Sequence, residues 1–193
     1  ATAKGIYDEF IKNRKYFGKL FIGKNGIAGA LNEEIIDIEK ENKTEIDKLI
    51  HTPGGAFGSC RIKLKDPKTD QEEFNKILEV FKKYNIGYFL YNGGGDSQDT
   101  TSKLSKFFRK NKVDIQCIGI PKTIDNDLPG TYSCPGFGTV AKYIATSTLE
   151  ASLDVSSMSK SSTKVFILEV MGRHAGWIAG SSALAKQDNY DAP

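Results

Sequence analysis

The sequence predicts an α/β fold, a mostly parallel sheet with helices on both faces. Segments in which apolar residues recur at helical spacing alternate with short apolar runs, and that alternation is typical of parallel sheets covered by helices. With 193 residues, the chain has room for one domain of ordinary size. We expect a single but partial α/β domain over 1–193, because the chain opens inside a helix-like segment and closes where a strand could begin.

The elements follow in that order along the chain. Ile6, Phe10 and Ile11 share one face of a first helix, and 16–22 is an apolar strand flanked by glycines. The later helices are expected over 72–84, 98–110, 138–158 and 175–186. The later strands are expected over 87–91, 113–120 and 164–171.

Composition excludes several classes of protein. The 27 basic and 24 acidic side chains leave a net charge of +3, too balanced to indicate nucleic acid or an anionic membrane as a partner. No stretch is apolar enough to span a bilayer. The three cysteines lack metal-ligand spacing, and an odd number is typical of reduced thiols in a cytoplasmic protein.

The most informative segment is Lys122–Asp127, directly after the strand over 113–120. Ligands bind beyond the carboxyl ends of strands in open α/β sheets. Asp125 has the chemistry of a general base toward a hydroxyl, Asp127 can hold a divalent cation through water, and Lys122 can face a phosphate. The alternative is a solvated turn, since Asp-Asn-Asp before Leu-Pro-Gly is also good turn composition.

Two glycine-rich segments indicate phosphate binding. Gly54, Gly55 and Gly58 allow close backbone approach, and Arg61 can bind phosphate oxygens with several donors. Segment 92–97 places three glycines between a strand and a helix, whose first amides favour an anion. The sequence lacks both the Walker ending and the full dinucleotide fingerprint, which disfavours ordinary nucleotide cradles and a dinucleotide-dependent oxidoreductase.

A fourth polar segment follows the expected strand over 164–171. Arg173 could stabilise phosphoryl charge there. A lone histidine such as His174 is more often structural than catalytic, and Trp177 is more often a core residue than a stacking platform. We expect all four polar segments to converge at one edge of the sheet.

Together these residues resemble the phosphofructokinase family over essentially the whole chain. The resemblance is carried, in family order, by the glycine turn ending in Arg61, Gly93–Ser97, Lys122–Asp127, Gly136–Thr139 and Met171–Arg173. It implies a partial Rossmann-like phosphofructokinase fold. It also implies that 1–193 holds most of the larger domain and the start of the substrate-binding part, without the family's first phosphate loop and its later sugar-phosphate ligands. We therefore expect no appreciable activity from these 193 residues alone.

The resemblance also implies roles for individual residues. Asp125 is expected to take the proton from the 1-hydroxyl of fructose 6-phosphate, with Lys122 and Arg173 also catalytic. The residues expected at the sugar phosphate and the transferred group are Thr123, Asp127, Lys164, Met171, Gly172 and Arg173. Those expected at the donor phosphates are Arg61, Gly94, Gly95, Asp96, Ser97 and Lys122. The expected cofactor is Mg²⁺, held by Asp127 and Asp96.

Departures from the family pattern indicate pyrophosphate as the donor. ATP-using members generally carry glycine where this chain has Asp96, and a carboxylate there would repel a third phosphate. Lys122, where many ATP enzymes have glycine, can pair with a compact diphosphate. Gly95 stands where the family usually has a magnesium-associated aspartate. This pairing of Asp96 with Lys122 is similar to the pyrophosphate-dependent branch.

The expected reaction is reversible, belongs to glycolysis and yields fructose 1,6-bisphosphate. Two alternatives remain open: an ATP-dependent 6-phosphofructokinase and a non-catalytic regulatory paralogue. Lys164 stands where the family often has an arginine that reaches a neighbouring subunit, so we expect the full-length protein to form a homo-oligomer, a dimer or a tetramer.

Overall fold

The computed structural model describes residues 1–186. Contacts between Cα atoms divide the chain into two compact units, Ala1–Pro121 and Lys122–Pro193. The first unit mixes helices with parallel and antiparallel strands, whereas the described part of the second contains helices and irregular segments. The α/β class expected from the sequence is confirmed.

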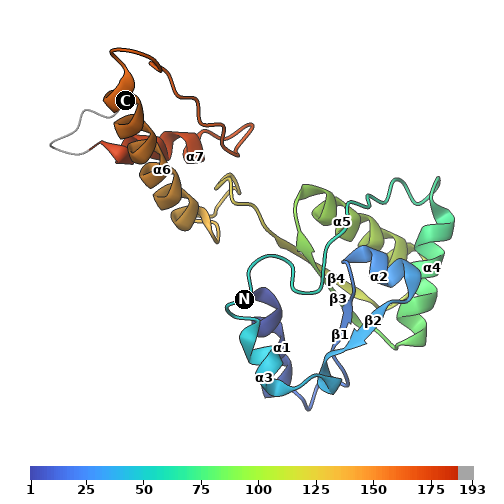
Figure 1. Ribbon diagram of the computed structural model, residues 1–193. Helices are drawn as coiled ribbons and strands as arrows, with labels where there is room; N and C mark the ends of the chain where they lie inside the picture. Colours follow the sequence, from blue (N-terminus) through green and yellow to red (C-terminus); the bar gives the residue numbers. More distant parts are fainter. Residues whose placement is uncertain (187–193) are drawn as a thin grey trace. The chain divides into compact units, whose positions relative to one another are not determined.

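The first unit contains most of the regular structure (Figure 1). Its helices are α1 (Thr2–Lys12), α2 (Ile27–Asn32), α3 (Lys43–Lys48), α4 (Gln71–Lys83), α5 (Gly95–Lys110) and the short 3₁₀ helix η1 (Ile38–Lys40). Its strands are β1 (Phe21–Gly23), β2 (Ile35–Asp37), β3 (Tyr88–Gly93) and β4 (Gln116–Pro121).

Parallel pairing joins β3 to β4. The register runs from Tyr88 opposite Gln116 to Gly93 opposite Pro121, so both strands deliver their carboxyl ends to the same edge. The other pair, β1 and β2, is antiparallel. The expected strand over 16–22 is wrong over most of its length, because the Tyr16 amide donates to the Asn13 carbonyl (2.9 Å) and closes a turn.

The core of the first unit lies where α4 and α5 face each other. The predicted apolar stripe of α4 is confirmed, since Phe74, Ile77 and Phe81 are all buried. The Phe74 ring lies 5.2 Å from that of Phe107 on α5, measured between centroids. Burying each such side chain contributes roughly 1.5–3 kcal/mol to folding. This packing therefore holds α5 against α4, and with it the loop that precedes α5.

The second unit is organised by α6 (Phe137–Met158), which matches the long helix expected over 138–158. Its buried face includes Ala141 and Ile144, and α6 contacts η2 (Ser181–Ala185) and α7 (Trp177–Gly180). The single helix expected over 175–186 is therefore wrong. The Ser181 hydroxyl donates to the Ile178 carbonyl (2.6 Å), and this competition with the helical ladder accompanies the change from α to 3₁₀ geometry.

The strand expected over 164–171 is also wrong. This segment has no regular secondary structure, and its side chains at Val165, Phe166 and Ile167 are 71%, 56% and 85% exposed. A strand requires a neighbour to complete its hydrogen bonds, and the described part of the second unit contains no other strand. The apolar composition of 164–171 therefore predicted a strand that does not form in the described part of the second unit.

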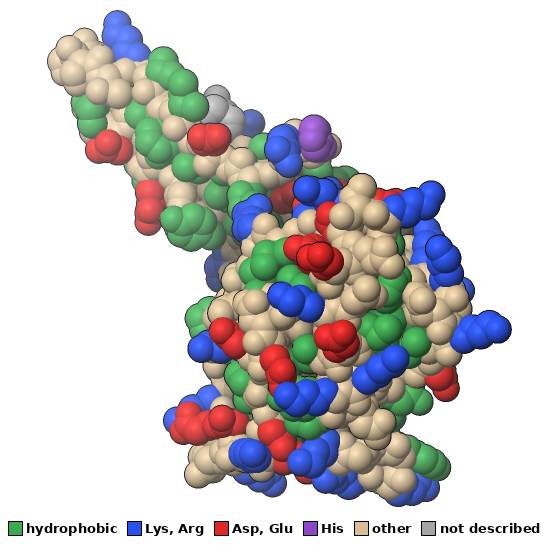
Figure 2. Space-filling view, turned by 90° about the vertical axis from the view of Figure 1, so that its right-hand side faces the viewer, with side chains coloured by type: hydrophobic (Ala, Val, Ile, Leu, Met, Phe, Trp, Pro, Cys, Tyr) green, Lys and Arg blue, Asp and Glu red, His purple; other side chains and the backbone are tan. Residues whose placement is uncertain are grey.

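Charges of both signs are mixed over the surface. On the face drawn in Figure 2, lysines and arginines are interspersed with aspartates and glutamates. Among residues 1–186, no helix combines the length and the apolar character needed to cross a bilayer.

Candidate active site

The acidic loop, Lys122–Asp127, follows β4 directly. Within it, the Thr123 hydroxyl oxygen accepts a hydrogen bond from the Asp125 amide (3.1 Å), which fixes the backbone immediately before the Asp125 side chain. The Asp125 Oδ1 atom is buried and has no hydrogen-bond partner within the described part of the chain. A buried oxygen without a donor is costly to maintain, and it can accept a hydrogen bond from a ligand hydroxyl.

Asn126 closes the same loop and was not among the expected site residues. Its Oδ1 accepts from the Cys134 amide (2.8 Å), and its Nδ2 donates to the Tyr132 carbonyl (3.4 Å). Its backbone is left-handed, with φ of 58°. The sequence did contain one indication of this role: asparagine adopts the left-handed conformation more readily than most residues, and Asn126 lies between the two aspartates of the loop. The chain bends sharply at Asn126, but the loop is not the solvated turn considered as the alternative, because it buries an oxygen of Asp125.

The other charged residues of the loop are accessible. Lys122 and Asp127 are exposed, and no hydrogen bond or ion pair engages either side chain in residues 1–186. A free carboxylate suits one position around Mg²⁺, which usually retains several water molecules. Asp127 therefore fits a magnesium ligand.

The expected donor residues lie in the first unit, at the beginning of α5. The Lys63 Nζ atom lies 2.6 Å from Asp96 Oδ1, and this carboxylate raises the pKa of Lys63. Arg61 and Lys63 are two positions apart in an irregular segment whose Leu64 side chain is fully buried. The Lys103 ammonium of α5 donates to the Leu64 carbonyl (3.1 Å). These contacts hold the segment carrying Arg61 against α5.

The glycine loop is shorter than expected, because α5 begins at Gly95 rather than Gln98 and takes Asp96 and Ser97 into its first turn. The Gly94 carbonyl accepts from the Ser97 amide (3.0 Å). A Cβ atom at Gly93 would collide with the Ser97 hydroxyl, so the strand can approach the helix this closely only with glycine. The first amides of a helix lack backbone partners and favour anions.

A tyrosine connects this loop with the preceding segment. The Tyr91 hydroxyl of β3 and the Cys60 sulfur both lie beside Gly26, 3.8 and 3.7 Å from the position of a Cβ atom there. Burial raises the pKa of Tyr91, while a hydrogen bond with Ser97 opposes that shift. Tyr91 and Cys60 therefore both lie close to Gly26, and Tyr91 also lies close to Ser97 in the first turn of α5.

The turn at Met171–Arg173 depends on glycine. Gly172 has a φ of 108°, and a Cβ atom there would lie 2.5 Å from the Ala175 carbonyl oxygen. The Ala175 amide donates to the Gly172 carbonyl (3.1 Å). Met171 is 70% exposed and Arg173 is also exposed, so both side chains are accessible to a ligand.

The remaining residues of that region are solvent-facing. Trp177 is 62% exposed, so the expectation of a core tryptophan is wrong. His174 and Lys164 are exposed.

The structure thus gathers the expected site residues in two groups, one in each unit. Asp96 and Asp127, the expected magnesium ligands, belong to different units. In residues 1–186, no three acidic, histidine or cysteine side chains form a group that could hold a metal ion. Asp96 is engaged by Lys63, which leaves Asp127 as the better candidate ligand.

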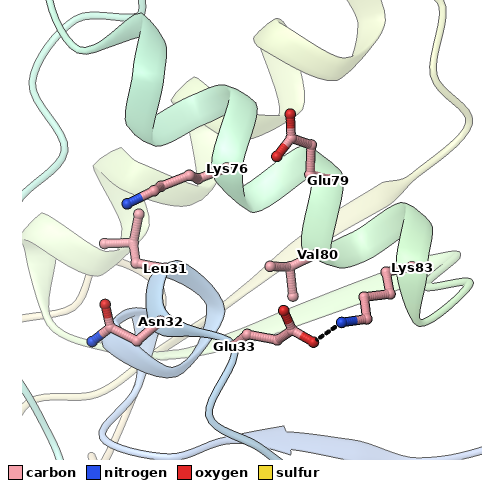
Figure 3. A pocket seen from close by; sticks show the side chains of 7 residues that line it. All are labelled: Leu31, Asn32, Glu33, Lys76, Glu79, Val80 and Lys83. Carbon is pink, nitrogen blue, oxygen red and sulfur yellow. Dashed lines mark hydrogen bonds and ion pairs between the residues drawn. The ribbon is translucent and has the colours of Figure 1, made fainter.

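An open hollow between α2 and α4 contains none of these residues. Figure 3 shows Glu33 and Lys83 facing each other across it, joined by an ion pair. That pair lowers the pKa of Glu33 and raises the pKa of Lys83. The hollow is lined by Leu31, Asn32, Glu33, Lys76, Glu79, Val80 and Lys83.

Comparison with known proteins identifies the family of the chain. The family model "Phosphofructokinase" matches residues 5–190. A relative from Halomonas elongata, named pyrophosphate--fructose 6-phosphate 1-phosphotransferase, is 54% identical over 193 residues, which are 100% of this chain and 46% of that protein.

Two solved structures of pyrophosphate-dependent phosphofructokinases are also similar. The Marinobacter aquaeolei structure is 58% identical with a TM-score of 0.82, covering 96% of this chain and 45% of its own. The Nitrosospira multiformis structure is 53% identical with a TM-score of 0.88, covering 99% and 47%.

The α/β fold, the acidic loop after a parallel strand and the glycine-rich loop before α5 are features of a phosphate-binding class of protein. The chain belongs to the phosphofructokinase family. It spans about half the length of these relatives.

Proposed function

We propose that this protein transfers a phosphoryl group from pyrophosphate to the 1-hydroxyl of fructose 6-phosphate, giving fructose 1,6-bisphosphate. The observation that carries the proposal is the buried, unpartnered Asp125 Oδ1 in the acidic loop. A carboxylate oxygen held ready for a donor is what a general base toward a hydroxyl requires. The name of the Halomonas elongata relative, pyrophosphate--fructose 6-phosphate 1-phosphotransferase, supports the same donor and acceptor.

In the proposed reaction, Asp125 removes the proton of the 1-hydroxyl while the sugar oxygen forms a bond to the near phosphorus of pyrophosphate. The bond between that phosphorus and the bridging oxygen breaks, and the second phosphate leaves with the bridging oxygen. Arg173 and Lys122 offset the negative charge of the transferred group. Thr123 contributes by fixing the Asp125 backbone, and Met171 and Gly172 shape the sugar-phosphate side.

Magnesium, when bound, would neutralise the charge of the donor phosphates. Asp127 would hold it, directly or through water, because its carboxylate is exposed and unpaired in residues 1–186. Asp96 is the weaker second ligand, because its carboxylate already pairs with Lys63.

Pyrophosphate is the preferred donor because of charge and size. An anionic side chain at position 96 disfavours a longer, more highly charged donor. Arg61 and the first turn of α5 supply positive charge and amide donors for a diphosphate. We further propose that the reaction is reversible and glycolytic, that the protein works in the cytoplasm, and that it forms a homo-oligomer in which Lys164 contacts the substrate of a neighbouring subunit.

The test uses the complete protein with Asp125 replaced by Ser, which keeps a small polar side chain but no base. We expect kcat to fall by about 10²–10⁴-fold, with fructose 6-phosphate affinity retained in calorimetric titration. Asp154→Ser is the matched control, because Asp154 is exposed on α6 and its carboxylate has no partner in the described structure. Unchanged turnover in Asp125→Ser would refute the proposal.

Measuring both donors on the same preparation separates the remaining alternatives. Turnover with pyrophosphate and not with ATP is the expected result. Turnover with ATP alone would identify an ATP-dependent enzyme, and binding of fructose 6-phosphate without turnover from either donor would identify a non-catalytic paralogue.

A further inference from the structure

We infer that Asn126 is the positioning residue of the proposed base, and that its side-chain amide fixes where Asp125 presents its carboxylate. This role rests on the proposed function. Asn126 does not contact the reacting atoms in this inference; it acts through its neighbour.

The backbone supplies the first part of the argument. Asn126 shares a peptide group with Asp125, and its φ of 58° turns the chain sharply just after the base. Most side chains disfavour this region, and asparagine and glycine are the usual exceptions. An ordinary residue would redirect the chain at the position next to Asp125.

The side chain supplies the second part. By bonding the Cys134 amide at 2.8 Å and the Tyr132 carbonyl at 3.4 Å, the amide of Asn126 ties together two stretches of chain eight positions apart. Cys134 is held in place by the residues packed around it, since it is only 2% exposed. Both the donor and the acceptor functions of the amide are used, and aspartate could reproduce only the acceptor.

The anchor continues into a long helix. The Cys134 carbonyl accepts from the Phe137 amide (3.0 Å), and Phe137 is the first residue of the 22-residue helix α6. Asn126 therefore connects the acidic loop with a rigid element. Active sites supported in this way keep their geometry better than free loops.

The carboxylate itself has no such support. Asp125 Oδ1 has no partner in the described structure, so the position of the base depends on the backbone around it. Thr123 fixes the preceding side, and Asn126 fixes the following side.

The experiment compares Asn126→Gly, Asn126→Ala and Asn126→Asp in the complete protein, with pyrophosphate and fructose 6-phosphate as substrates. Asn126→Gly retains the left-handed backbone and removes only the side-chain bonds. We expect its kcat to fall about 100-fold, with each KM changed less than about threefold, because substrate binding does not require the amide. Asn126→Ala should be slower still, and Asn126→Asp should recover part of the rate through its bond to the Cys134 amide.

Asn111→Gly is the matched control. Asn111 Nδ2 also donates to a backbone carbonyl, that of Phe107 (2.8 Å), but it lies at the end of α5 and away from the acidic loop in sequence. This variant should lower the melting temperature and leave kcat unchanged. Circular dichroism and thermal unfolding of every variant distinguish a misplaced base from a lost fold.

Each outcome is decisive. A wild-type kcat in Asn126→Gly while Asp125→Ser is inactive would overturn the inference and leave the proposed function intact. Turnover by Asp125→Ser would refute the proposed function itself. Raised KM values with unchanged kcat, or loss of the fold in all three Asn126 variants, would show that Asn126 does not position a base.

Discussion

Lys63 forms an ion pair with Asp96, with 2.6 Å between Nζ and Oδ1. The pair joins the segment that carries Arg61 to the first turn of α5. Asp96 is the residue expected to select between the two donors. Its carboxylate is oriented by Lys63, which the sequence pattern did not identify. The proposed donor preference therefore involves a pair of residues rather than one carboxylate.

Replacing Asp96 with glycine in the complete protein should relax the choice of donor. Removal of the negative charge should raise the ratio of kcat/KM for ATP to that for pyrophosphate by about tenfold or more. Steady-state kinetics with both donors measure this ratio. Asp154→Ser, on the exposed side of α6, is the control and should leave the ratio unchanged.

Replacing Lys63 with methionine should affect donor binding more than stability. Both members of the pair are largely exposed, with side-chain exposures of 57% and 69%, and exposed ion pairs add little to stability. We expect an unchanged melting temperature and a KM for pyrophosphate raised by less than about fivefold. A large fall in melting temperature would contradict this account.

Gly172→Ala should disturb the turn at Met171–Arg173. The added Cβ atom would press on the Ala175 carbonyl at a φ that alanine disfavours. In the complete protein, the KM for fructose 6-phosphate should rise on the order of tenfold. Gly176→Ala is a close control, because nothing lies within 4 Å of a Cβ atom there, and it should behave like the wild type.

Leu104→Ala should test the core that supports the donor residues. Leu104 of α5 is fully buried, and such truncations typically cost about 2–5 kcal/mol. Urea unfolding of the 193-residue chain measures the loss. Leu90→Ala, at a side chain that is 38% exposed, should cost clearly less.

Cys117 should make stability depend on alkaline pH. Burial raises the pKa of this thiol from 9.0 to about 11. Below about pH 9 both states keep the proton; above it the unfolded chain releases the proton first, so stability falls until about pH 11. A shift of one pKa unit corresponds to about 1.36 kcal/mol, and because Cys117 is only partly buried, solvent screening keeps the loss below about 2–3 kcal/mol. Cys117→Val should reduce this slope in urea unfolding between pH 8 and 10.5.

Helices α4 and α5 of the first unit were predictable because each buries one regular face, whereas the short helices α2 and α3 were not predicted. Phe74, Ile77 and Phe81 recur at helical spacing and meet the core together. The position of the acidic loop after a parallel strand was also predictable, since the loop follows an apolar run in the sequence. The spacing of apolar residues was enough to predict an element wherever the residues that bury it lie in neighbouring elements of the chain.

Features that depend on distant or irregular partners were not predictable. The run over 164–171 has the composition of a strand, but residues 122–186 contain no strand with which it could pair. Strand β1 is shorter than expected, and a turn closed by the hydrogen bond from the Tyr16 amide to the Asn13 carbonyl precedes it. Lys63 was not identified because its ion pair is with Asp96, 33 positions away, and Asn126 was not identified because its side chain bonds Tyr132 and Cys134, 6 and 8 positions away. Periodicity contains no information about such contacts.

The uncovered apolar segment around Phe166 and Ile167 has a practical consequence for handling the 193-residue polypeptide. Bare amides and carbonyls beside apolar side chains offer a template for intermolecular strand addition. Recovery after dilution from denaturant should consequently decline as protein concentration increases, and a lysine at Ile167, which is already 85% exposed, should improve the yield without weakening the monomer.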